Sequence, residues 1–195
     1  MDTYSNFNEL KSSETKWSIT LENRRSPISI LAPHGGNIEP HTSEIATMVA
    51  ADRYNLFCFN GLKQDNNQAL HITSHKYDEQ QALSLVHDSL LVITIHGCTH
   101  SDPMVFIGGL HNQIKKEIAF SLERFKIPAT ICDKGSAYGG QHPDNICNRG
   151  QIGRGIQLEI SRPMRDTPQA WYTIALAIRE ALAPLRKDSL LESDQ

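Results

Sequence analysis

Residues 28–40 read ISILAPHGGNIEP, an apolar run that leads into a glycine pair flanked by a histidine and a glutamate. The run from Ile28 to Ala32 predicts a buried strand. His34 stands at the end of this run, and the two glycines that follow allow the backbone to fold tightly, so that Glu39 returns to the same point. Because zinc accepts both imidazole and carboxylate ligands, the segment predicts a metal-binding turn at the end of a strand.

The rest of the chain alternates strand-like apolar runs with amphipathic helical stretches. Besides the strand at residues 27–32, we expect strands at residues 54–59, 90–95, 104–107, 128–132 and 154–160, and a short strand or extended stretch at residues 69–74. We expect helices at residues 42–51, 79–87, 111–125 and 167–182. Strands that alternate with helices predict an α/β fold, with a mixed and mostly parallel central sheet flanked by helices.

Length and composition are those of one globular domain. The chain has 195 residues, of which 39% are hydrophobic and 21% are charged. We therefore expect a single domain over residues 1–195, with flexible ends at residues 1–15 and 187–195. Its four cysteines form no CxxC pair, so we expect free thiols.

Charge and hydropathy exclude several classes of protein. The net charge is −3 with neutral histidines, and no run of five basic residues occurs, so a general nucleic-acid binder is disfavoured. No segment is long enough to span a bilayer, and the first residues lack the basic and apolar regions of a signal peptide. We therefore expect a cytoplasmic chain as synthesised, with no membrane partner.

A second histidine occupies the same kind of position as His34. His96 ends the apolar run 91–95 and precedes a glycine. In open α/β sheets, functional residues collect beyond the carboxyl ends of the strands, so the two histidines are expected to meet there. His96 is therefore the best third ligand beside His34 and Glu39. Glu44 is the alternative carboxylate ligand, although its position in the first turn of a helix is already explained by the helix dipole.

Glu159 is an ionisable residue between apolar neighbours at the end of the last predicted strand. A general base for a zinc-bound water is one explanation, because partial burial raises the pKa of a carboxyl group. A structural ion pair with Arg162 is the other. Glu159 is thus a candidate catalytic residue, and Arg162 also remains a weaker candidate for a substrate groove.

Two further residues are candidates for the substrate side of the site. Arg149 lies in a loop bounded by glycine, where a planar guanidinium can hold a carboxylate or polarise a carbonyl group. His71 is a candidate substrate-binding or proton-donating group. His71 and His75 do not form a ligand pair, because an extended backbone between them would separate them by about 13 Å.

Several segments, taken in order, resemble the poly-γ-glutamate hydrolases of phages and Bacillus, which are zinc peptidases with a carboxypeptidase-like core. The matching segments are residues 2–7 (DTYSNF), 32–36 (APHGG), 39 (E), 42–44 (TSE), 70–74 (LHITS), 95–97 (IHG), 145–146 (NI) and 157–161 (QLEIS). Several such segments in one order are more specific than any single motif.

The resemblance implies a zinc-dependent hydrolase of the γ-glutamyl amide bonds of poly-γ-glutamate. It implies one Zn²⁺ on His34, Glu39 and His96, Glu159 as general base, and Arg149 as the arginine that binds substrate. A monomer suffices for this activity, and a phage-type enzyme released by lysis would meet the capsule polymer outside the cell. Two alternatives remain open: a zinc amidohydrolase of small N-acyl amino acids, and a non-catalytic binding or replication-associated protein.

Overall fold

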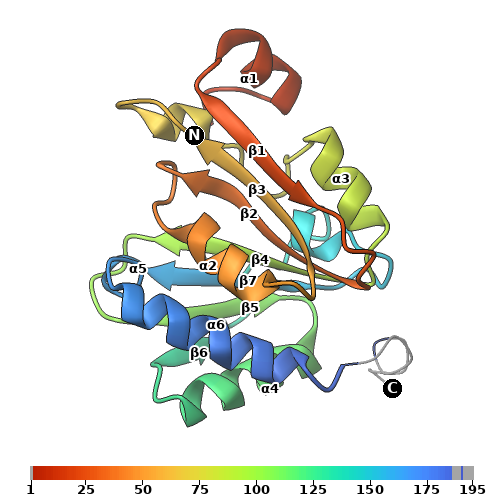
Figure 1. Cartoon of the computed structure of the whole chain (residues 1–195), viewed down its shortest axis with the longest axis vertical. Coiled ribbons are helices and arrows are strands. Elements are labelled where there is room, and N and C mark those ends of the chain that lie inside the picture. Colours follow the sequence, from red (N-terminus) through yellow and green to blue (C-terminus); the bar gives the residue numbers. More distant parts are fainter. Residues whose placement is uncertain (1, 186–189, 191–195) are drawn as a thin grey trace.

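The computed structural model describes residues 2–185 and 190, and its centre is a seven-stranded mixed sheet (Figure 1). The strand order is β1-β3-β2-β4-β7-β5-β6. The outer strand β1 and the inner strand β5 run antiparallel to their neighbours β3 and β7, whereas the other pairings are parallel. The strands are β1 (Trp17–Glu22), β2 (Ile28–Gly36), β3 (Asn55–Gly61), β4 (Leu91–Cys98), β5 (Val105–Gly109), β6 (Ala129–Ile131) and β7 (Ile156–Ser161). The fold is therefore the single-domain α/β fold with a mixed central sheet that the sequence predicts.

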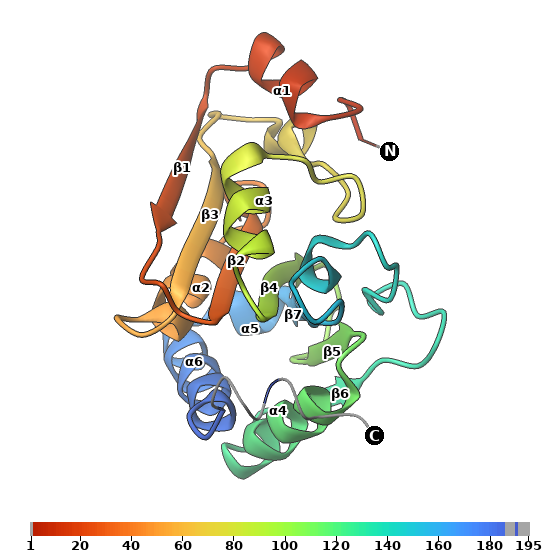
Figure 2. The same ribbon diagram turned by 90° about the vertical axis from the view of Figure 1, so that its right-hand side faces the viewer.

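Helices cover both faces of the sheet. The α-helices are α1 (Phe7–Ser13), α2 (Thr42–Ala50), α3 (Gln80–His87), α4 (Asn112–Arg124), α5 (Arg162–Arg165) and α6 (Pro168–Leu182), and two 3₁₀ turns are η1 (Asn67–Leu70) and η2 (Ile146–Asn148). In Figure 1, α2 and α6 cross in front of the sheet. Figure 2 shows α3 on the opposite side, next to the segment that carries η2.

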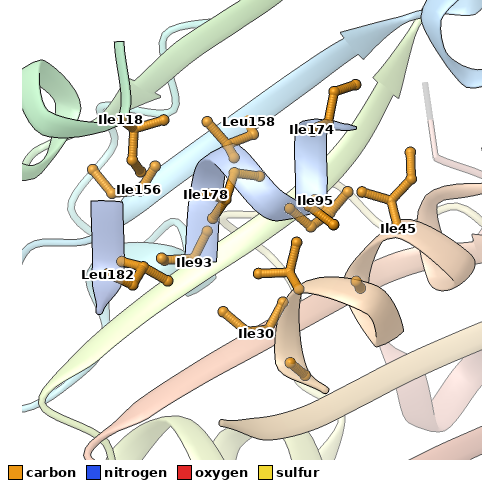
Figure 3. Close-up of a cluster of buried hydrophobic side chains, with 14 of the residues drawn as sticks. Ile30, Ile45, Ile93, Ile95, Ile118, Ile156, Leu158, Ile174, Ile178 and Leu182 are labelled. Carbon is orange, nitrogen blue, oxygen red and sulfur yellow. The ribbon is translucent and has the colours of Figure 1, made fainter. Parts of the chain in front are cut away.

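The central strands are buried on both faces, which explains their continuous apolar runs. In β4, Ile93 and Ile95 point toward α2, α4 and α6, whereas Val92 points toward the cluster under α1 and α3. Figure 3 shows the first of these layers, in which side chains of β2, β4 and β7 pack against those of the three helices. In β7, Ile156 and Leu158 belong to this layer. Side-chain alternation therefore turns the polar residues of β7 toward the other face.

Most predicted elements are found within a few residues of their expected bounds, but residues 69–74, expected as a short strand or an extended stretch, form no strand. This segment forms η1 and then an irregular stretch that crosses the edge of the sheet. Its apolar residues Leu70 and Ile72 are buried in the cluster under α3, which accounts for the strand-like pattern. The sequence analysis did not predict α1, β1 or α5.

The N-terminal segment is folded onto the sheet, and the cysteines are not paired. Residues 7–13 form α1, and its Phe7 and Leu10 are buried against the sheet. Of the expected flexible end at 187–195, all residues except Leu190 lie outside the described residues. The four cysteines, Cys58, Cys98, Cys132 and Cys147, are buried free thiols, as expected. In the described part of the chain, no helix is long and apolar enough to cross a membrane.

Candidate active site

The strand ends of β2, β4 and β7 form the floor of the candidate site. These three strands are neighbours and run parallel, so their carboxyl ends meet at one edge of the sheet. His96 of β4 and Glu159 of β7 are direct register partners. The residue before each of them, Ile95 or Leu158, points into the apolar layer under α6. Because side chains alternate along a strand, His96 and Glu159 face the other side of the sheet, which carries α3 and η2.

A tight turn brings Glu39 back to His34. The pairing of β2 with β3 shifts register between Ala32 and Gly35, and the amide of Glu39 donates to the carbonyl of His34 over 2.9 Å. Gly36 has a φ of +60°, and a Cβ atom on it would lie 2.5 Å from the carbonyl oxygen of Gly61. The turn therefore requires glycine at this position, for both its conformation and its close approach to β3.

Three potential ligand atoms converge at this turn. His34 Nδ1 lies 3.0 Å from Glu39 Oε1 and 3.1 Å from His96 Nδ1. His96 Nδ1 lies 3.6 Å from Glu39 Oε2. Both histidine side chains are 2% exposed, and the Glu39 side chain is 13% exposed. The structure thus brings together the three candidate ligands. His34 and Glu39 are only five residues apart in the sequence, whereas His96 lies 57 residues after Glu39.

The tautomer of His34 suits a metal ligand. Its Nε2 lies 2.8 Å from the carbonyl oxygen of Ile72, which can only accept a hydrogen bond. The proton of a neutral ring is therefore on Nε2, and the lone pair of Nδ1 faces Glu39 and His96. A second hydrogen bond of this kind orients the ring in most metal sites that contain histidine. Glu39 is itself held by the amide of Gly97, which donates to its Oε2 over 2.8 Å.

His71 lies beside the cluster, where it is a competing ligand. His34, Glu39 and His71 each offer one ligand atom, and these atoms lie within 4.8 Å of one another. The rings of His71 and His34 are 4.0 Å apart. Asp2 lies 2.9 Å from His71 Nδ1 and also accepts hydrogen bonds from the amide and hydroxyl of Thr73. The Asp2 carboxylate therefore fixes the position of His71, a contact that the sequence analysis missed.

Glu159 and Glu39 are two carboxyl groups with opposite pKa shifts. Burial, and then repulsion from Glu39, raise the pKa of Glu159 to about 8. Burial alone would also raise the pKa of Glu39, but interactions with His34 and His96 hold it well below the usual range. Two carboxyl groups whose environments separate their pKa values in this way are typical of an acid–base site.

Two connected clefts open onto these groups. One has a volume of about 650 Å³ and the other of about 330 Å³, and Glu39, His71 and Glu159 line both. The larger cleft continues toward the side chains of Arg162 and Arg165. The smaller cleft is lined by several imidazoles, those of His34, His71, His75, His96 and His142. The two clefts together form an open groove across the candidate site.

The two candidate arginines differ in their distance from the groove. Arg149 lines neither cleft: it is exposed, its Nη1 donates to the carbonyl of Tyr77 over 2.8 Å, and it borders a separate depression beside α3. Arg162 lies in the larger cleft, where it pairs with Asp166 at 2.7 Å and not with Glu159. Glu44 is half-exposed on α2, where its Oε1 lies 4.0 Å from Nδ1 of His41.

Arg165 is a site residue that the sequence analysis missed. Its side chain is buried, and its guanidinium donates hydrogen bonds to the carbonyl groups of Pro40, Cys98 and Ile160. These three residues follow Glu39, His96 and Glu159 closely in the chain. Arg165 therefore ties together the three segments that carry the candidate ligands and the candidate base. Its position in the short helix α5 gave no sequence pattern by which to find it.

The fold is an α/β fold, and the site combines an imidazole–carboxylate cluster with a half-buried carboxyl group of raised pKa in an open groove. These features define a candidate hydrolase. The chain belongs to the poly-gamma-glutamate hydrolase family, whose model matches residues 4–174. This finding confirms the resemblance that the sequence segments indicated.

Relatives from Bacillus subtilis (strain 168) are similar to most of this chain. The UPF0714 protein YndL is 34% identical over 168 residues, which are 85% of this chain and 66% of that protein. The UPF0714 protein YmaC is 36% identical over 168 residues, or 85% of this chain and 71% of that protein. The SPbeta prophage-derived UPF0714 protein YoqZ is 36% identical over 176 residues, or 89% of this chain and 64% of that protein. This chain thus spans about two thirds of the length of these relatives.

Two solved structures have nearly the same fold. Zinc-free apo YndL superposes with a TM-score of 0.90 at 30% identity, over 94% of this chain and 98% of that one. A bacteriophage poly-gamma-glutamate hydrolase superposes with a TM-score of 0.89 at 29% identity, over 94% of this chain and 97% of that one. The fold described above is therefore that of the family.

Proposed function

We propose that this protein is a zinc-dependent hydrolase that cleaves the γ-glutamyl amide bonds of poly-γ-glutamate. The observation that carries the proposal is the convergence of His34 Nδ1, Glu39 and His96 Nδ1 in a groove that also contains Glu159. The family of the chain and its similarity to a bacteriophage poly-gamma-glutamate hydrolase support the substrate. YndL, a relative, has a structure described as zinc-free, which supports the metal.

The residues present fit one zinc ion. Three groups that carry lone pairs lie 3.0–3.6 Å from one another, and such an arrangement needs a shared proton or a cation to be stable. Two imidazoles and one carboxylate form a common ligand set of catalytic zinc. We assign the metal to His34, Glu39 and His96, with His71 as the competing third ligand. Bound zinc polarises a carbonyl group and lowers the pKa of water.

Glu159 is the proposed general base. It lies on the strand next to His96 and lines both clefts, so it faces a substrate bound in the groove. In its ionised form it accepts the proton of the attacking water, and it then delivers this proton to the leaving amide nitrogen. In the metal-free structure the pKa of Glu159 is raised to about 8, so the carboxyl group can hold a proton near neutral pH until the proton passes to the nitrogen.

The groove offers cationic groups to a polyanionic substrate. Poly-γ-glutamate carries one free α-carboxylate for each residue. Arg162 lies exposed in the larger cleft, and we propose that it binds such a carboxylate, with His71 as a second polar contact. Arg149, the other arginine proposed to hold an α-carboxylate, is exposed beside α3 and could contact only a part of the polymer that extends beyond the two clefts.

The remaining parts of the proposal concern the setting of the enzyme. A single chain contains all the proposed groups, so we propose a monomer that acts without nucleic acid or a membrane. We further propose that the chain is synthesised in the cytoplasm and reaches capsule polymer after lysis, as a phage-derived enzyme would.

The experiment that tests the proposal follows the size of the polymer. Zinc-loaded protein is incubated with high-molecular-weight poly-γ-glutamate, and the product is analysed by gel filtration beside Glu159→Gln and a chelator-treated sample. We expect rapid shortening by the wild type and none in either control. An intact polymer in the presence of stoichiometric zinc would contradict the substrate and turn attention to small N-acyl amino acids. An intact polymer without bound zinc would favour a binding protein.

The choice of the third ligand is tested separately. We expect His96→Ala to lose stoichiometric zinc by elemental analysis, whereas His71→Ala keeps it, because His71 is already held by Asp2. The opposite result would assign the metal to His34, Glu39 and His71.

A further inference from the structure

A chain of three hydrogen bonds leads from the backbone to the carboxyl group of Glu159. The backbone N–H of Cys147 donates to Asn145 Oδ1 over 3.1 Å. Asn145 Nδ2 donates to Gln157 Oε1 over 2.8 Å, and Gln157 Nε2 donates to Glu159 Oε1 over 3.0 Å. The side chains of Asn145 and Gln157 are buried, so water does not compete for these contacts.

The direction of this chain is fixed at its backbone end. The oxygen and nitrogen of a side-chain amide have nearly the same shape, so an isolated amide can turn over. The backbone N–H of Cys147 can only donate, however, and therefore selects Asn145 Oδ1. Asn145 must then present its NH₂ group to Gln157, and Gln157 must present its own NH₂ group to Glu159. Each amide has only one orientation that satisfies both of its neighbours.

We propose that Asn145 and Gln157 are positioning residues, and that this amide relay holds the Glu159 carboxylate in one orientation for proton transfer. Gln157 and Glu159 are two residues apart on β7, so their side chains project from the same face of the sheet. Gly140 packs closely against Gln157, because a Cβ atom on Gly140 would lie 2.7 Å from Gln157 Cβ. The loop that contains Gly140 and Asn145 thereby determines how the base on β7 is held.

The catalytic role of the relay rests on the proposed function, but its hydrogen bonds are testable without any substrate. Asn145→Asp keeps an acceptor for the Cys147 amide but offers no N–H to Gln157. The Gln157 amide must then turn its NH₂ group toward the new carboxylate and its oxygen toward Glu159, where two acceptors oppose each other. In a Glu159→Gln background, the amide at position 159 can donate to this oxygen, so the conflict disappears.

A double-mutant cycle on stability measures this conflict. Urea unfolding is followed at pH 9 in the presence of a chelator for the wild type, Asn145→Asp, Glu159→Gln and the double variant. We expect the loss of unfolding midpoint caused by Asn145→Asp to be at least halved in the Glu159→Gln background. A loss of equal size in both backgrounds would overturn the relay.

Asn148→Asp is the matched control for a new charge in the same loop. Asn148 is also buried, but its NH₂ group donates to the carbonyls of Gly140 and His142, away from Gln157 and Glu159. We expect its effect on the midpoint to be the same with and without Glu159→Gln. Equal relief of Asn145→Asp and Asn148→Asp would show simple charge repulsion and would overturn the proposal.

Gln157→Met gives a test that adds no charge and preserves the volume of the side chain. With zinc content and KM unchanged, we expect kcat on poly-γ-glutamate to fall by about 10- to 100-fold, the range for loss of a hydrogen bond to a charged group. Unchanged kcat in Gln157→Met, or a fall that comes with loss of zinc, would overturn the positioning role. If the wild type itself does not cleave the polymer, the stability cycle still decides whether the relay exists.

Discussion

The raised pKa of Glu159 predicts that replacing this residue stabilises the metal-free protein at alkaline pH. The pKa of Glu159 is about 8, against a usual value of 4.5 that also describes the unfolded chain. Because the folded value is the higher one, the contribution of Glu159 to stability is fully present below about pH 4.5 and is lost as the pH rises through 8. The ionised carboxyl group is then repelled by Glu39, whose lowered pKa keeps it charged over the same range.

The size of the effect follows from the interval between these pKa values. The interval of about 3.5 corresponds to about 5 kcal/mol, at about 1.4 kcal/mol for each pH unit. Contact with solvent in the cleft reduces this value, and we expect Glu159→Gln to gain at least about 2 kcal/mol over the wild type between pH 5 and pH 9. Glutamine keeps the shape of the side chain and its contact with Gln157, so packing changes little.

The assay is urea unfolding in the presence of a chelator at pH 5, 7 and 9, followed by tryptophan fluorescence. Glu44→Gln, a change at a half-exposed position of α2, is the control and should show no such dependence on pH. The reasoning is refuted if the free energy of unfolding of Glu159→Gln relative to the wild type is the same at pH 5 and pH 9, or if the variant becomes the less stable protein as the pH rises.

Three further predictions concern the site and the core. Gly97→Ala should lower activity at least about 10-fold and stability by about 1–3 kcal/mol, because its Cβ would lie 2.4 Å from Arg165 Cζ. Polymer hydrolysis and urea unfolding measure the two effects, and full activity would contradict the role of Arg165. Asp2→Ala should leave zinc affinity unchanged but lower kcat/KM, because loss of the Asp2 carboxylate releases His71. Steady-state kinetics and zinc titration measure the two quantities, and loss of zinc would instead assign His71 to the metal. Ile93→Ala should lower the free energy of unfolding in urea by about 2–5 kcal/mol with zinc content preserved, because Ile93 of β4 is fully buried under the helices. A loss below about 1 kcal/mol would contradict this packing.

The residues that could be predicted from the sequence are those whose position follows from a strand. His34 and His96 directly end or follow apolar runs, and parallel strands must bring their carboxyl ends together, so their meeting is a consequence of the fold class. Glu159 was found for a related reason, since a carboxylate inside an alternating apolar strand requires a partner or a function.

The residues that could not be predicted are those held only by tertiary contacts. Arg165 donates hydrogen bonds to three carbonyl groups at the site from a four-residue helix. Arg149 instead donates to the backbone of Tyr77, away from the two clefts. In the sequence, both are arginines near glycine-rich or polar loops. No local pattern separates the two. The strand β1 was missed because it is an edge strand whose residues are half-buried or exposed, so its sequence lacks the apolar run of a central strand.

Two of the four buried thiols can report on how different parts of the protein open. Burial raises the pKa of Cys58 to about 11 and that of Cys147 further, so neither thiol reacts with an alkylating reagent while it is enclosed. Cys58 lies in β3 within the main core, whereas Cys147 lies in η2, in the loop that carries Asn145. The rate at which Cys147 is labelled therefore measures how often this loop opens. The rate at which Cys58 is labelled measures how often the sheet separates from its helices.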